Sequence, residues 1–302
     1  MPSSLLTDSG LETWLIFHRQ VDLPEFAAFP LLGSNDGRRL LAEYYRDHLR
    51  VAADAGSGIV LETPTWRASA DWGARLGYSA DQLDDVNRDA VAFLRSLGTE
   101  FGDVPLVVSG TIGPRDDGYA PSEQLTPEEA ADYHHAQIMS FVTAGADRVT
   151  MLTATHAGEA IGVVQAARTA GADVVVAFTV ETDGRLPSGQ PLAEAVAEVD
   201  AATSGAALHF GINCAHPDHF GSVLAEDPAA YERVRLLRAN ASRASHAELD
   251  EAEELDAGDP SELAAQYAAL VEAHPHLQEL GGCCGTDVRH VAAIATTCIG
   301  GT

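Results

Sequence analysis

The 302-residue sequence predicts a single-domain (β/α)8 barrel over residues 1–302, and three observations support this fold class. Short apolar runs rich in β-branched residues alternate with longer segments rich in alanine and charge. Eight such pairs follow one another, and the chain length suits one barrel. No internal repeat, low-complexity tract or linker divides the sequence. A doubly wound open sheet is the alternative architecture that the same alternation allows.

The runs expected to form strands are, in chain order, 5–7, 58–62, 105–109, 148–152, 174–180, 207–212, 234–239 and 277–280. The expected helices cover 40–54, 84–98, 127–144, 157–170, 191–203, 219–231, 261–273 and 287–297. Local signals support several helix starts. Thr126-Pro127-Glu128-Glu129 combines an N-cap, a proline at the first helical position and acids in the first turn. After the seventh strand, the acid-rich insertion 240–262 is expected to be a solvated loop or a lid.

The charge balance excludes several classes of function. The chain has 45 acidic and 18 basic residues, which gives a formal net charge of −27. Such a field repels polyanions, so nucleic acids and anionic membrane surfaces are excluded as partners, whereas a cationic small molecule is tolerated. The sequence contains no lysine. Lysine Schiff-base chemistry and a phosphate-binding P-loop are therefore excluded as well.

The cellular compartment that the sequence predicts indicates whether the four cysteines form disulfides. There is no apolar stretch of about 20 residues that could span a bilayer, and the first residues lack the pattern of a signal peptide. We therefore expect a cytoplasmic protein, in which thiols stay reduced. Cysteines in such a protein indicate metal binding or catalysis rather than disulfides.

Three cysteines form the strongest motif in the sequence. Cys283 and Cys284 lie in Gly281-Gly282-Cys283-Cys284-Gly285-Thr286, directly after the eighth expected strand, and Cys214 follows the sixth. The carboxyl ends of barrel strands meet at one face, so the three thiols are expected to converge. Three thiolates leave a tetrahedral Zn2+ one open position, as in catalytic sites. Cys298 is the remaining cysteine and is expected to be a small buried hydrophobe.

Histidines near these cysteines are weaker candidates. His216 and His219 could compete as ligands, but a surface or supporting role is their usual one. The pair His134 and His135 lies on an expected helix, where solvent exposure is predicted.

The chemistry of such a centre favours thiol alkylation. A thiol that binds at the open position of the metal loses its proton, which gives a nucleophile at neutral pH. No protein nucleophile is then required, and the natural reaction is transfer of a small electrophile, such as methyl, to a substrate thiol.

These motifs identify a resemblance to the zinc-dependent homocysteine S-methyltransferases, which are (β/α)8 barrels. The resemblance covers nearly the whole chain and is carried by Gly211-Ile212-Asn213-Cys214 and the Gly281–Thr286 run. It implies that the three motif cysteines bind zinc and that homocysteine is methylated to methionine. It also implies that Asp8 and Asn240 hold the amino acid part of the substrate, and Glu12, Thr153 and Asn213 are further residues expected to bind substrate. A capping or turn role for Asp8 and a purely structural role for Asn240 are the alternatives.

One departure from the family pattern concerns the acceptor. The family usually has a glutamate at the end of the fourth strand that contacts the substrate amino group, and Leu152 stands there in this chain. A buried ammonium group needs a partner. Glu12, Glu62 or Glu181 replaces that glutamate, or the acceptor is a thiol or selenol other than homocysteine. Ser9, which replaces the usual glycine, could also crowd the first loop.

The length resembles that of the short family members that use a sulfonium methyl donor, S-methylmethionine or S-adenosylmethionine. Trp14, Trp66 and Trp72 could offer cation–π faces to such a donor, with core packing as the alternative role. Two other classes stay open: a zinc hydrolase and a non-catalytic barrel that binds zinc or thiols. The partners expected are small molecules, and the sequence leaves the oligomeric state open.

Overall fold

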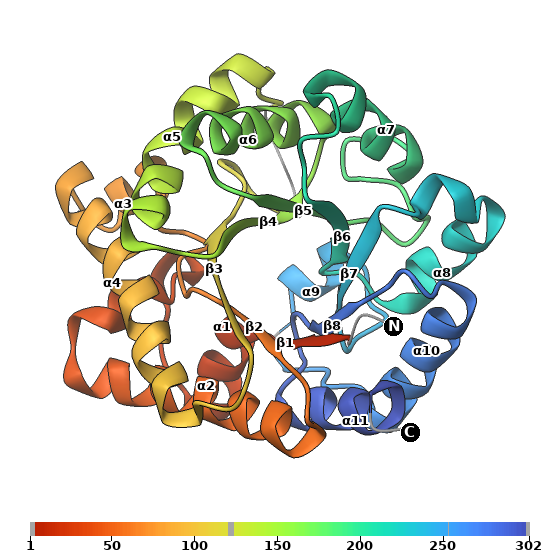
Figure 1. Cartoon of the computed structure of the whole chain (residues 1–302), viewed down its shortest axis with the longest axis horizontal. Coiled ribbons are helices and arrows are strands. Elements are labelled where there is room, and N and C mark those ends of the chain that lie inside the picture. Colours follow the sequence, from red (N-terminus) through yellow and green to blue (C-terminus); the bar gives the residue numbers. More distant parts are fainter. Residues whose placement is uncertain (1–3, 120–123, 253, 300–302) are drawn as a thin grey trace.

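A computed structural model of the protein describes residues 4–119, 124–252 and 254–299. Within them, eight parallel strands form a closed barrel in the order β1 to β8, with β1 paired to β8. The strands are β1 Leu5–Thr7, β2 Ile59–Glu62, β3 Leu106–Ile112, β4 Arg148–Ala154, β5 Val174–Phe178, β6 His209–Asn213, β7 Val234–Ala239 and β8 Glu279–Gly282. Figure 1 looks down this barrel, with the helices arranged around it. The predicted fold class is confirmed.

The helices that the structure describes are α1 Leu11–Thr13, α2 Asn35–Ala55, α3 Ala70–Arg75, α4 Ala80–Gly98, α5 Pro127–Ala144, α6 Ala157–Ala170, α7 Leu192–Thr203, α8 Pro217–Glu226, α9 His246–Asp250, α10 Pro260–Ala273 and α11 Val288–Cys298. The expected cap of α5 is present, because Thr126 and Glu129 form a complete capping box. The helix predicted over 219–231 is shorter than expected. It ends at Glu226, since Pro228 disfavours helical backbone in the residue before it.

The amino end of the barrel interior is closed by buried charges. Arg148 of β4 donates two hydrogen bonds of 2.7 Å to the carboxylate of Glu279 in β8. Burial alone would raise the pKa of Glu279, but His209 and Arg148 lower it to about 2. This bidentate pair links strands on opposite sides of the barrel and leaves the carboxyl end open for a site.

The acidic insertion is folded onto that carboxyl end rather than extending as a solvated loop. Ser245 begins α9 with a capping box, and the side chain of His246 is buried. His246 Nδ1 lies 3.0 Å from Glu181 Oε1, and its Nε2 lies 2.8 Å from the carbonyl oxygen of Cys214. Leu249 and Leu255 of the insertion line the cavity described below.

None of the helices in the described residues is long and apolar enough to cross a membrane.

Candidate metal and substrate site

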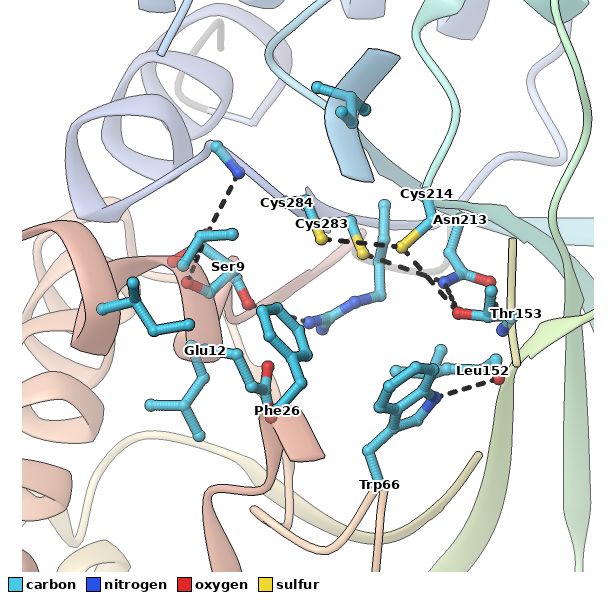
Figure 2. Close-up of a pocket in the computed structure, with 18 of the residues that line it drawn as sticks. Ser9, Glu12, Phe26, Trp66, Leu152, Thr153, Asn213, Cys214, Cys283 and Cys284 are labelled. Carbon is cyan, nitrogen blue, oxygen red and sulfur yellow. Dashed lines mark hydrogen bonds between the residues drawn. The ribbon is translucent and has the colours of Figure 1, made fainter. Parts of the chain in front are cut away.

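A cavity of about 560 Å3 opens at the carboxyl end of the barrel. Seven of the eight strands contribute a residue at or just after their ends: Asp8, Glu62, Thr111, Thr153, Asn213, Arg238 and Cys283. This placement is the usual location of barrel active sites. Figure 2 shows that the three motif cysteines lie together on one wall of the cavity.

The cysteine sulfurs of Cys214, Cys283 and Cys284 all lie within 4.8 Å of one another. Backbone packing explains the glycines beside them. A Cβ atom at Gly281 would lie 1.9 Å from Thr7 Oγ1, and one at Gly282 would lie 2.1 Å from Thr286 Oγ1. Only glycine lets β8 lie this close to Thr7 and Thr286. The close approach brings Cys283 and Cys284, which follow β8, to the thiol of Cys214.

The three thiols fit a tetrahedral metal ion. With metal–sulfur bonds of about 2.3 Å, tetrahedral ligands lie about 3.8 Å apart. The sulfurs of Cys214 and Cys284 are 4.0 Å apart, and all the cysteines are free thiols. Among the described residues, no histidine or carboxylate joins this group. The donor set is therefore three sulfurs, which favours zinc or another soft metal ion and leaves a fourth position for a ligand.

The protonation states of the three thiols also favour a cation bound between them. Hydrogen bonds from the Cys214 and Cys284 thiols, together with the charge of Arg238, hold the pKa of Cys283 well below its usual range. Hydrogen bonding to Cys283 raises the pKa of the Cys214 thiol, and that of Cys284 is raised as well. One thiolate forms easily, whereas three adjacent thiolates require a compensating positive charge.

Asn213 and Thr153 hold the cluster from the β4 side. Asn213 Oδ1 accepts a 2.7 Å hydrogen bond from the Thr153 backbone N–H, and its Nδ2 donates to Thr153 Oγ1 at 2.9 Å. The same Nδ2 lies 3.8 Å from Cys283 Sγ. Thr153 and Cys214 adopt φ values of +65° and +53°, which are uncommon for residues other than glycine. Such backbone strain clusters at functional sites, where surrounding contacts maintain it.

Two further residues that sequence analysis missed contact the cluster. Tyr119 Oη lies 3.5 Å from Cys284 Sγ, and the Tyr119 ring stacks on His246 at 4.2 Å between centroids. His246 in turn contacts the carbonyl of Cys214. Tyr119 comes from the loop after β3 and His246 is the first residue of α9, so no sequence pattern near the cysteines indicates their role.

The histidines singled out in the sequence lie elsewhere. His216 caps α8 by accepting from the backbone N–H of Asp218, and His219 contacts the carbonyl of Arg243. The predicted exposure of His134 is wrong. Its side chain is fully buried and lies 2.9 Å from the carboxylate of Glu159, because α5 packs closely against α6.

Asp8 lies in the cavity wall but is paired with a cation that was not expected. Arg238 Nη2 donates to Asp8 Oδ1 at 2.6 Å, and the backbone N–H of Glu62 donates to Asp8 Oδ2 at 2.8 Å. Both charged side chains are buried. Burial alone would lower the pKa of Arg238, but Asp8, Glu62 and Cys283 raise it, so the guanidinium stays charged. An arginine inside an apolar strand run is the sequence signal that could have found this pair, because buried charges need partners.

The remaining candidates differ in their access to the cavity. Glu12 and Leu152 line it, and Leu152 packs against Trp66. Asn240 is buried, its Oδ1 has no hydrogen-bond partner among the described residues, and it is not among the residues that line the cavity. Cys298 is half-buried against the core, outside the thiol cluster.

The three tryptophans already have cations on their faces. The guanidinium of Arg67 lies 3.5 Å from the ring centroid of Trp72 and 4.2 Å from that of Trp66. Arg19 lies 4.7 Å from the centroid of Trp14. A ligand cation would have to share these rings with the protein's own arginines.

Comparison with known proteins identifies the family. The sequence profile described as homocysteine S-methyltransferase matches residues 5–298. Among solved structures, the homocysteine methyltransferase MmuM from Escherichia coli in its oxidized form superposes with a TM-score of 0.78 and 21% identity, covering 97% of this chain and 95% of that one. Its metallated form gives a TM-score of 0.77 and 19% identity, covering 97% and 96% of the two chains. Among curated proteins, no sequence matches. The family expected from the sequence is confirmed: this chain belongs to the homocysteine S-methyltransferase family and is a methyltransferase.

Proposed function

We propose that this protein transfers a methyl group from a sulfonium donor, S-methylmethionine or S-adenosylmethionine, to the thiol of homocysteine and so produces methionine, with Zn2+ held by Cys214, Cys283 and Cys284. The observation that carries the proposal is the three-thiol cluster on the wall of a closed-barrel cavity. Zinc bound there would supply the positive charge that keeps the acceptor thiol deprotonated near pH 7.

The protein's own residues prepare this chemistry. Asn213 fixes the backbone before Cys214 through its two hydrogen bonds to Thr153, and it directs its amide toward Cys283. Such hydrogen bonds orient metal ligands and tune the charge on sulfur. The cavity volume falls within the range that holds small-molecule ligands.

The transfer balances without a protein nucleophile. A bond forms between the acceptor sulfur and the methyl carbon while the bond from that carbon to the sulfonium sulfur breaks. The electron pair stays on the donor sulfur, which becomes a neutral thioether, and the thiol proton leaves to solvent. The strongly acidic chain would attract such a cationic donor and repel nucleic acids. Reduced thiols would require a reducing compartment, as expected for a cytoplasmic enzyme.

The test combines metal analysis with a matrix of sulfonium donors against thiols, read as methylated product by mass spectrometry. We expect about one zinc per chain and methionine formation that Cys283→Ser abolishes. Cys298→Ser is the matched control, because that cysteine lies outside the cluster. A protein without zinc, or full methyl transfer by Cys283→Ser, would refute the proposal.

A second candidate function is the same methyl transfer to an acceptor other than homocysteine. Leu152 places an apolar side chain where the family resemblance expects an ammonium partner, which favours another thiol or a selenol. The same matrix separates these cases. Ester or amide hydrolysis without a thiol acceptor would indicate a zinc hydrolase, and bound zinc without any turnover would indicate a non-catalytic barrel.

A further inference from the structure

The charged groups around the cavity decide where the cationic part of a ligand can bind. The family resemblance expects two anionic positions, one at the end of β4 and one at Asp8. Leu152 occupies the first and packs against the Trp66 ring. Asp8 uses both carboxylate oxygens, one on Arg238 at 2.6 Å and one on the backbone N–H of Glu62 at 2.8 Å. Neither position offers an uncompensated negative charge.

Three glutamates could replace the strand-end glutamate of the family, and two of them, Glu62 and Glu181, are engaged within the protein. Glu62 accepts from Thr111 Oγ1 at 2.8 Å, and its other oxygen is buried 3.9 Å from Arg148. Glu181 lies 3.0 Å from His246 and is not among the residues that line the cavity. These contacts leave both carboxylates with protein partners.

Glu12 differs from both. It projects from α1 into the cavity, beside Phe26 and across from Trp66 and Leu152 in Figure 2. Within the described residues, no arginine or histidine forms an ion pair with it. The charges of Arg67 and Arg238 reach Glu12 only at longer range, and those of Asp8 and Cys283 oppose its ionisation. Burial and these neighbours raise the pKa of Glu12 to about 7.

A carboxylate in this setting favours a cationic ligand. A half-buried carboxylate without a cationic partner is unstable in its charged form, and an organic cation that enters the cavity removes the cost of burying that charge. Phe26 and Phe17, which also line the cavity, add apolar surface for the alkyl part of the ligand. Glu12 on α1 therefore offers the cavity a carboxylate in place of the strand-end glutamate of the family.

We propose that Glu12 is the specificity-determining residue that binds the organic cation of a substrate, either the ammonium group of the thiol acceptor or the sulfonium group of the donor. This inference rests on the proposed methyl transfer, and it goes further by requiring a cationic substrate group at α1 rather than at β4.

Two matched ligand pairs test it. Homocysteine and 4-mercaptobutanoate differ by the ammonium group, and S-methylmethionine and methionine differ by the second S-methyl group and the sulfonium charge that it creates. The wild-type protein should prefer the cationic member of at least one pair by about tenfold to a hundredfold, and Glu12→Gln should reduce that preference to less than about threefold. The homocysteine pair reports acceptor binding through KM, and the S-methylmethionine pair reports donor binding by calorimetry.

The control is Glu25→Gln, which removes another carboxylate that lines the cavity. Glu25 already pairs with Arg75 at 3.3 Å, so the preference within each ligand pair should be unchanged. Unchanged zinc content and circular dichroism show that the variants fold. Equal preferences in wild type and Glu12→Gln for both pairs would overturn the inference.

Calorimetry measures ligand binding without turnover, so the Glu12 proposal can be tested even if the proposed reaction does not occur. If no thiol is methylated but the zinc-loaded protein binds a cationic ligand in a Glu12-dependent way, the proposed function fails and the Glu12 site stands. If methionine forms and neither preference depends on Glu12, the reaction stands and the Glu12 site fails.

Discussion

The buried pair of Asp8 and Arg238 provides the sharpest test of how the site is built. Their carboxylate and guanidinium are 2.6 Å apart, and the two residues are only 2% and 3% exposed. Arg238 also donates to Thr7 Oγ1 at 2.8 Å and to the carbonyl of Ser9 at 3.1 Å. Arg238→Met keeps most of the side-chain volume and removes the charge and all three hydrogen bonds.

The expected cost follows from this burial. Removing one member of a buried, hydrogen-bonded ion pair costs about 3–5 kcal/mol, because the other charge stays buried without a partner. For a chain of this size the unfolding entropy is about 0.6 kcal/mol per degree, so Tm should fall by about 5–8 °C. Asp8→Asn should cost a similar amount. The double variant should cost less than the sum of the two, with a coupling free energy of about 2 kcal/mol or more.

Thermal and urea unfolding, followed by circular dichroism at constant zinc content, measure these values. Without Arg238 the pKa of Asp8 rises further, since burial already raises it. The folded variant then takes up a proton that the unfolded chain does not, so its deficit should shrink as the pH falls from 8 to 5. Arg243→Met, which breaks exposed pairs with Asp218 and Glu262, should cost less than about 1 kcal/mol. Additive single-variant costs, or a change in Tm below about 2 °C for Arg238→Met, would refute the reasoning.

Three further predictions concern Glu12, Asn213 and His246. Burial raises the pKa of Glu12 to about 7 in the folded state, so ionising Glu12 lowers stability as the pH rises from about 4.5 to 7. Glu12→Gln should therefore match the wild type near pH 4.5 and exceed it by about 3 kcal/mol at pH 8, measured by urea unfolding. Asn213→Asp places a carboxylate oxygen where an amide now lies 3.8 Å from Cys283 Sγ, and its zinc dissociation constant should rise about tenfold to a hundredfold in a chelator competition. His246→Ala removes the contacts to Glu181 and to the Cys214 carbonyl, so the backbone amides of α9 should exchange hydrogen at least about tenfold faster in mass spectrometry.

Each of these predictions has a clear contrary result. A Glu12→Gln stability difference that does not change with pH would show that Glu12 is ionised normally. Unchanged zinc affinity in Asn213→Asp would show that the Asn213 amide does not affect zinc binding. Equal exchange in α9 with and without His246 would show that other contacts hold the insertion.

Local patterns in the sequence determined the architecture and the three cysteines that form the thiol cluster. Alternating apolar runs and capped helices specify the barrel because strand and helix formation depend on neighbouring residues, as the Thr126 capping box shows. The three cysteines were identifiable because barrel topology brings the carboxyl ends of β6 and β8 to one face. Glycines beside Cys283 and Cys284 mark the same place, where the backbone of β8 touches Thr7 and Thr286.

Only the tertiary structure decided which charges of the site remain free. Arg238 neutralises Asp8 across 230 residues of sequence, and His246 fixes the insertion against Cys214. Such pairings depend on strand register and on loop paths over the barrel mouth, which no sequence spacing encodes. The sequence offered Glu12, Glu62 and Glu181 as equal substitutes for the missing glutamate. In the folded chain, Glu62 and Glu181 lie beside Arg148 and His246, whereas Glu12 lines the cavity without an arginine or histidine partner among the described residues. The physical reason is that a carboxylate's role depends on its neighbours in space, and barrel closure sets those neighbours.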